Sequence, residues 1–177
     1  ERTWHIWVQH SYTAEVKLME GDKELDRVTA RFGCRSFEIH PEKGFLLNGK
    51  KYPLRGVSRH QDHLGVGNAL TRKHHKEDME LICEVGANTI RLAHYPHDDF
   101  FYELCDRYGM VIWAEVPFIT DIGGDGDYEN MDSIREAYVQ NIKEQLIELI
   151  RTQYNRPSIM FWGLQNEVRP DYNEFMS

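Results

Sequence analysis

The chain has 177 residues, of which 41% are hydrophobic and 28% are charged, and its formal net charge is −8. The negative charge argues against a nucleic-acid partner, which requires a basic surface. No apolar run approaches the roughly 20 residues that cross a bilayer, so a membrane span is excluded. Cys34, Cys83 and Cys105 are scattered without metal-binding spacing, and we expect structural thiols. The chain opens without an initiator methionine. We therefore expect a piece of a longer protein, for which a homo-oligomer is possible.

The first 53 residues are predicted to be β-structure. The predicted strands cover residues 13–19, 26–32, 37–40, 45–47 and 50–52. Polar and apolar residues alternate in the first two, which is the period of half-buried strands. Asn48-Gly49 is a strong hairpin signal, because both turn positions need positive φ. Two or three antiparallel strands cannot close a core alone, so we interpret residues 1–40 as the last strands of a β-sandwich.

After Pro53, predicted strands alternate with predicted helices. The strands cover residues 54–58, 88–93, 110–116 and 158–164, and the helices cover residues 71–85, 97–108 and 133–154. This alternation predicts an α/β fold with a parallel sheet, either a (β/α)8 barrel or an open doubly wound sheet. No Gly-x-Gly-x-x-Gly follows the first strand, which removes the commonest reason for the open sheet. A complete barrel takes about 250 residues, so if the fold is a barrel, residues 41–177 hold its first half, strands one to four.

Each predicted helix has an apolar face. The expected core residues are Met79, Ile82 and Val85, then Phe100, Phe101, Leu104, Cys105 and Tyr108, then Ile134, Ala137, Ile142, Leu146, Leu149 and Ile150. Gly86 and Gly109 follow the first two helices in the usual C-terminal position. Ser133 and Glu136 have capping-box spacing at the start of the third.

Polar side chains follow all four predicted barrel strands. They lie in residues 59–63, 91–97, 115–117 and 166–167. The last strand is almost wholly apolar, and a buried ionised carboxylate is costly, so we expect Glu167 to lie just past its end. Strand ends of a barrel meet at one rim, where the chemistry occurs. Loops are polar in general, but four ends crowded with His and Arg exceed that expectation.

The histidines at these ends are weak metal candidates. They form two pairs with a spacing of three, His60 with His63 and His94 with His97. Residues three apart at a strand end point to opposite faces, so we predict no metal site. His74 and His75 start a helix and are expected to be solvated.

The sequence allows Arg91 and Glu115 either a structural role or a role in substrate binding. Each either pairs with a charge inside the barrel or contacts the substrate, and structural pairing is the favoured role of Glu115. A guanidinium inside a barrel must be paired, and a catalytic carboxylate is the natural partner of Arg91.

On these residues the chain resembles glycoside hydrolase family 2, the β-galactosidase and β-glucuronidase family. The matching stretches are residues 32–38 (FGCRSFE), 47–50 (LNGK), 55–63 (RGVSRHQDH), 86–96 (GANTIRLAHYP), 101–106 (FYELCD) and 162–167 (WGLQNE). They keep the family's order over nearly the whole chain. The resemblance implies an immunoglobulin-like sandwich that ends in residues 1–40, followed by the catalytic barrel.

The resemblance also implies roles for the rim residues. Glu167 is similar to the family's general acid/base, Asn166 to the residue that binds the sugar 2-hydroxyl, and Arg91 to the residue that supports the nucleophile. The residues similar to walls of the sugar subsite are His94, Asp62 and His63. The family is retaining, which requires two carboxyl groups about 5 Å apart. The acid/base must be protonated at the first step, so its pKa must be raised by its neighbours.

In the family the nucleophile lies on the seventh barrel strand, which would fall beyond Ser177. We therefore expect these 177 residues alone to hydrolyse nothing. Metal-dependent β-galactosidases of the family carry an acidic ligand and a histidine shortly after the third strand. Residues 116–121 (VPFITD) contain no Glu and no His, so we expect no cofactor and no magnesium requirement.

Residues 59–63 and 113–118 (WAEVPF) are more similar to β-galactosidases than to β-mannosidases. We predict part of a retaining exo-β-glycosidase that acts on terminal β-galactosides, with a carbohydrate as its partner. Two alternatives stay open, a β-glucuronidase of the same family and a non-catalytic carbohydrate-binding relative. A second glutamate on the seventh strand would distinguish an enzyme from a binder.

Overall fold

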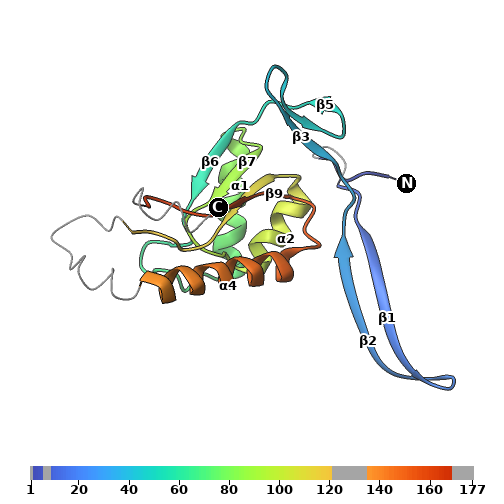
Figure 1. Ribbon diagram of the computed structural model, residues 1–177. Helices are drawn as coiled ribbons and strands as arrows, with labels where there is room; N and C mark the ends of the chain where they lie inside the picture. Colours follow the sequence, from blue (N-terminus) through green and yellow to red (C-terminus); the bar gives the residue numbers. More distant parts are fainter. Residues whose placement is uncertain (1, 6–8, 121–134, 169–177) are drawn as a thin grey trace.

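A computed structural model describes residues 2–5, 9–120 and 135–168, and Figure 1 shows their arrangement. The strands in these ranges form a two-stranded hairpin, a three-stranded antiparallel sheet and a four-stranded parallel sheet. The hairpin contains β1 (Tyr12–Glu20) and β2 (Lys23–Phe32), and the antiparallel sheet contains β3 (Phe37–His40), β4 (Gly44–Leu47) and β5 (Lys50–Lys51). Among the described helices, none combines the length and apolarity that a bilayer crossing requires.

The parallel sheet confirms the predicted alternation of strands and helices. It contains β6 (Gly56–Arg59), β7 (Thr89–Leu92), β8 (Val111–Glu115) and β9 (Ile159–Gly163), hydrogen-bonded in chain order. The connecting helices are α1 (Arg72–Glu84), α2 (Asp99–Tyr108) and α4 (Arg135–Gln153). Parallel strands joined in order by helices are the repeating unit of a (β/α)8 barrel.

The helices bury their apolar side chains against one face of the parallel sheet. This core contains Met79 and Ile82 of α1, Phe101 and Leu104 of α2, Ile142 and Leu149 of α4, and Ile90, Leu92, Ile112 and Ala114 of the strands. Alternate residues of a strand point to opposite faces. The side chains of Arg91, Trp113 and Glu115 therefore point to the other face, which is the interior side of a barrel.

The last residues predicted for the cores of α1 and α2 are exposed rather than buried. Val85 and Tyr108 are 71% and 45% exposed. Each lies at the end of its helix, where Gly86 and Gly109 turn the chain with φ of 76° and 71°. The glycine stop signals are thus confirmed, whereas the burial predicted for the residues before them is wrong.

The histidine and α4 predictions also need correction. His75 is only 2% exposed, although we expected it to be solvated, because α1 turns its side chain toward the buried guanidinium of Arg59 in β6. Ala137 is exposed rather than part of the α4 core, and Val139 is buried instead. Ser133 and Ile134 lie outside the described residues, so the predicted capping box has no structural account.

The three-stranded sheet packs on the N-terminal ends of β8 and β9. Its Phe45 and Leu47 form a second core with Trp4 of the N-terminal segment, Val111 of β8 and Met160 of β9. Asn48 and Gly49 have φ of 50° and 75° and make the predicted turn between β4 and β5. Because β3 pairs with β4, this sheet crosses the predicted boundary between residues 40 and 41.

The β1–β2 hairpin extends away from both sheets (Figure 1). Tyr12 pairs with Phe32 and Val16 with Val28, so one face of the hairpin is apolar. The opposite face carries ion pairs among Lys17, Arg27, Glu15 and Glu24. The predicted alternation is confirmed but the predicted half-burial is not. Val16 and Val28 are 69% and 63% exposed, because none of the described residues covers the apolar face.

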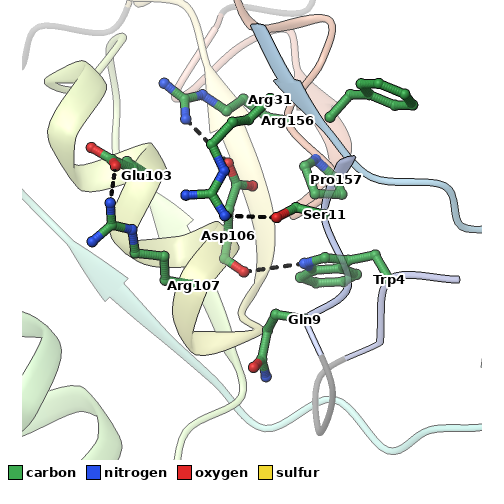
Figure 2. A pocket seen from close by; sticks show the side chains of 10 residues that line it. Trp4, Gln9, Ser11, Arg31, Glu103, Asp106, Arg107, Arg156 and Pro157 are labelled. Carbon is green, nitrogen blue, oxygen red and sulfur yellow. Dashed lines mark hydrogen bonds and ion pairs between the residues drawn. The ribbon is translucent and has the colours of Figure 1, made fainter. Parts of the chain in front are cut away.

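Asp106 of α2 anchors the N-terminal segment to the parallel sheet unit (Figure 2). Its carboxylate accepts hydrogen bonds from the hydroxyl of Ser158 at 2.6 Å and from Arg156 at 3.1 Å, and its carbonyl accepts one from the Trp4 indole at 3.1 Å. Burial raises the pKa of this carboxyl, and the bonds from Ser158 and Arg156 act in the opposite direction. A cavity of about 220 Å³ lies beside these contacts, on the side of the N-terminal ends of the strands.

Gly163 allows close packing on the interior face of the sheet. A Cβ atom there would lie 2.2 Å from Nε1 of Trp113 and 2.6 Å from Cγ of Glu115. We expect Gly163→Ala to lower the free energy of unfolding by about 1–3 kcal/mol, the usual cost of overpacking, as measured by thermal unfolding. Gly56→Ala is the matched control, because its Cβ would meet Thr89 at an ordinary 3.5 Å. Equal stability losses in the two variants would contradict this prediction.

Candidate active site

An ion pair joins β7 and β8 near the C-terminal ends of these strands. Arg91 donates from Nε to Oε1 of Glu115 at 2.5 Å and from Nη2 to Oε2 at 3.2 Å. The Glu115 side chain is 1% exposed, and a buried carboxylate requires such a partner. The structural pairing favoured for Glu115 is therefore confirmed, and within the described residues Glu115 is the carboxylate that pairs with Arg91.

Arg91 also reaches the segment that follows β9. Its Nη2 donates to Oδ1 of Asn166 at 2.9 Å. The backbone N–H of Asn166 donates to the carbonyl of Phe118 at 2.9 Å, so the segments after β8 and β9 are tied together. Because Oδ1 of Asn166 is engaged by Arg91, the amide NH₂ group is oriented to donate elsewhere.

His94 completes a cluster of four polar side chains. Its Nδ1 lies 3.0 Å from Oε2 of Glu115 and 3.2 Å from Nη2 of Arg91. A carboxylate only accepts and a guanidinium only donates, so one Nδ1 cannot bond to both. We assign the shorter contact, in which Nδ1–H donates to Glu115, and this leaves Nε2 as an acceptor. The peptide bond between Ala93 and His94 is cis.

Glu167 lies just past β9, as predicted, and directly follows Asn166. It is exposed, and its φ of 51° lies in the left-handed region that is uncommon for residues other than glycine. Its backbone carbonyl accepts a hydrogen bond from the N–H of Thr120 at 3.3 Å. The backbone of Glu167 is thus tied to the segment after β8, beside the polar cluster.

Asp62 and His63 occupy the loop after β6, and both are exposed. The contacts of His63 run to the carbonyl of Leu64, to the backbone of Gly67 and to the ring of His74, which it stacks upon at 4.6 Å between centroids. The histidine beside His94 is instead His60, with 4.9 Å between ring centroids. Within the described residues, the structure brings His94, Arg91 and Asn166 together, whereas the contacts of His63 described above are with its own loop and with α1.

His60 and Trp113 are interior-side residues to which the sequence reasoning gave no role in the sugar subsite. Ser58 pairs in register with Arg91, so counting by two from Ser58 reaches His60 on the interior face. Trp113 pairs in register with Arg91 and is 44% exposed on the same face. The alternation of side chains between the two faces of a strand was the signal in the sequence. It identifies the interior residues only when the register of β6, β7 and β8 is known.

Two other groups predicted for the rim, Arg59 and His97, lie on the helix side of the sheet. Arg59 is 6% exposed and His97 is also 6% exposed, and they meet at 3.0 Å between Nη1 and Nδ1. Burial lowers the pKa of His97 to about 4, with a hydrogen bond to Ala93 opposing the shift. Burial also lowers the pKa of His75, which bonds to the same guanidinium. Both imidazoles are therefore neutral at pH 7.

The magnesium site of metal-dependent relatives does not fit the described residues after β8. Val116 and Phe118 are buried apolar side chains, and Pro117, Ile119 and Thr120 add no carboxylate or imidazole. In the ranges that the structure describes, no group of three or more His, Cys, Asp or Glu side chains is arranged to hold a metal ion. Asp121 lies outside those ranges.

Comparison with known proteins gives consistent matches over most of the chain. A family model described as the TIM barrel domain of glycosyl hydrolases family 2 matches residues 37–176. A β-glucuronidase of Bacteroides fragilis is 49% identical over 159 residues, which are 89% of this chain and 22% of that protein. A β-galactosidase of Thermoanaerobacter pseudethanolicus is 32% identical over 173 residues, which are 97% of this chain and 22% of that protein.

A solved structure agrees with these sequence matches. The crystal structure of a Bacteroides uniformis β-glucuronidase superimposes with a TM-score of 0.81 at 39% identity, and the match covers 94% of this chain and 19% of that one. The chain spans about a fifth of the length of the curated relatives it matches. By sequence and by structure, the chain belongs to glycoside hydrolase family 2, and residues 37–176 match the TIM barrel domain of that family.

Proposed function

We propose that the chain supplies the acid/base half of the active site of a retaining exo-β-glycosidase, with a terminal β-hexoside as substrate. The observation that carries this proposal is the cluster of Arg91, Glu115, His94 and Asn166 at the C-terminal strand ends, next to Glu167. In a (β/α)8 barrel this rim is where the catalytic groups lie. The buried ion pair at the base of the cluster supports a fixed geometry for the groups above it.

Each side chain has a role in this proposal. Glu167 protonates the glycosidic oxygen and later deprotonates the attacking water. Asn166, whose Oδ1 is engaged by Arg91, presents its NH₂ group to the sugar 2-hydroxyl. Arg91 supports the nucleophile, a second carboxylate that family members carry on the seventh barrel strand. His94, Asp62 and His63 form walls of the sugar subsite, and Nε2 of His94 accepts a hydrogen bond from a sugar hydroxyl.

The substrate class follows from the relatives. The sequence motifs predicted a β-galactoside. Relatives at 49% and 42% identity are named β-glucuronidase and putative β-glucuronidase, whereas two relatives named β-galactosidase are at 32% and 34% and a solved structure named putative β-galactosidase is at 40%. We therefore expect the whole enzyme to hydrolyse aryl β-D-glucuronides with a higher kcat/KM than aryl β-D-galactosides. The measurement is a panel of p-nitrophenyl glucuronide, galactoside and mannoside, with the product anomer identified by NMR. Faster turnover of the galactoside would restore the original prediction.

The same panel tests the reaction type. Hydrolysis with retained anomeric configuration is the expected result, because the family chemistry uses two displacements. Binding of a sugar without hydrolysis of any substrate would contradict the enzymatic proposal and favour a non-catalytic carbohydrate-binding relative. Hydrolysis with inversion would contradict the double displacement.

We assign residues 1–40 to an immunoglobulin-like sandwich and residues 41–177 to the first half of the barrel. The apolar face of the β1–β2 hairpin supports the sandwich, because a second sheet packed against it would bury Val16 and Val28. The pairing of β3 with β4 makes this boundary a continuous antiparallel connection rather than a flexible linker.

The proposed activity needs no metal ion. Residues 116–120 contain no ligand of the type that magnesium prefers, which is a carboxylate oxygen. We expect the activity of the whole enzyme to be unchanged after dialysis against EDTA, as measured by initial rates on the aryl glycoside. Loss of activity on chelation that magnesium restores would contradict this prediction.

A further inference from the structure

A buried arginine lies behind the candidate active site, on the helix side of the sheet. The guanidinium of Arg59, at the end of β6, lies 2.7 Å from a carboxylate oxygen of Asp78 and 3.8 Å from the ring centre of Phe101. It also bonds to Nδ1 of His75 and to Nδ1 of His97, each at 3.0 Å. One charged group thus holds two buried histidines in equivalent ways.

Among the hydrogen bonds of the described residues, the imidazole of His97, and not that of His75, bonds to the backbone next to His94. The Nε2 of His97 lies 3.1 Å from the carbonyl oxygen of Ala93. Because a guanidinium only donates, Nδ1 of His97 must be the acceptor, and its Nε2–H must donate to Ala93. Arg59 therefore determines the tautomer that His97 needs for this bond.

Ala93 is held on both sides of its backbone. Its N–H donates to the carbonyl of Arg59 at 3.0 Å, and its carbonyl accepts the bond from His97. Ala93 is itself fully buried. The next residue is His94, so these two bonds set the orientation of the peptide from which the His94 side chain projects.

We propose that Arg59 and His97 are positioning residues, which act through Ala93 to hold His94 in the sugar subsite. This inference rests on the proposed function, in which His94 contacts the sugar. His75 has no such role, although it is as buried as His97 and bonds to the same guanidinium at the same distance.

The matched pair of histidines allows a direct test in the whole enzyme. We expect His97→Leu to raise KM by about 10- to 100-fold on the preferred aryl glycoside, the scale that misplacement of a binding group produces. We expect His75→Leu, which removes an equivalent bond to Arg59, to lower the thermal unfolding temperature without a change in KM. His97→Gln should recover most of the lost affinity, because its amide can donate to Ala93 and accept from Arg59.

KM distinguishes positioning from general damage. A variant that is partly unfolded has fewer active molecules, which lowers the apparent kcat and leaves KM unchanged. Equal effects of His97→Leu and His75→Leu on KM, or an unchanged KM in His97→Leu, would overturn the proposal. If the wild-type enzyme hydrolyses none of the glycosides, the proposed function fails. The positioning role is then tested by crystal structures of the two variants. Displacement of the His94 side chain in His97→Leu but not in His75→Leu would support it, and an unmoved His94 in His97→Leu would overturn it.

Discussion

Glu167→Gln in the whole enzyme is expected to lower kcat on a glycoside with a poor leaving group, such as an alkyl alcohol, by about 10²- to 10⁴-fold, the range of general acid–base catalysis. The amide has no proton to give to the leaving oxygen. On an aryl glycoside with an activated leaving group the first step needs little acid assistance, so that step should be much less affected. A larger loss of initial rate on the alkyl glycoside than on the activated aryl glycoside is therefore the result expected of a general acid.

The second displacement offers an independent readout of the same carboxylate. Water needs a general base to attack the glycosyl–enzyme, whereas azide carries no proton to lose. We expect azide to accelerate Glu167→Gln on the activated substrate and to yield a glycosyl azide with the β configuration. Glu38→Gln, at an exposed carboxylate of β3 far along the chain from the rim, is the matched control and should behave as wild type.

Two outcomes would remove Glu167 from the mechanism. An unchanged rate on the poor leaving group would show that another group donates the proton. Equal losses on both substrates with no azide effect would indicate a structural role.

Arg91→Met is expected to destabilise the barrel by about 3 kcal/mol, because it removes the guanidinium that pairs with the buried carboxylate of Glu115 and leaves that carboxylate with the bond from His94. It also frees Oδ1 of Asn166, so activity should fall together with stability. The double variant Arg91→Met with Glu115→Leu should recover much of the stability, since replacing both members of a buried pair is far less damaging than removing one. It should not recover activity, because the Asn166 amide remains unsupported.

The measurements are the thermal unfolding temperature and hydrogen–deuterium exchange of the peptides that contain β7 and β8. Exchange there should rise in the single variant and fall back in the double variant, because local opening follows local stability. Arg55→Met, at an exposed arginine just before β6, is the control for loss of a positive charge. A double variant no more stable than the single would show that the ion pair itself does not hold the strands together.

Much of the fold could be predicted from local sequence. The period of two in β1 and β2, the Asn48-Gly49 turn and the glycines that end α1 and α2 are local signals, and each of these elements forms where expected. The apolar run before Asn166 placed that residue and Glu167 past a buried strand. Such signals depend on neighbours a few residues apart, so the chain alone carries them.

The direction of the strand-end side chains could not be predicted in the same way. Arg59 and His60 are adjacent, yet one is buried among α1 and α2 and the other lies beside His94. Their directions depend on the register of β6 against β7, which pairs Ser58 with Arg91 across the intervening helix. The burial of His75 depends on the same arrangement, because its partner Arg59 comes from the preceding strand.

The sequence by itself determined the order of the elements, the family and the rim at which Glu167 lies. Only the tertiary structure decided that Arg91, Glu115, His94 and Asn166 form one cluster, while Arg59, His75 and His97 form another on the helix side. The physical reason is that a buried charge must find its partner across strands. The pairing of β7 with β8 brings Glu115, 24 positions along the chain, to Arg91. The pairing of β8 with β9 brings Asn166, 75 positions along the chain, to the same side chain.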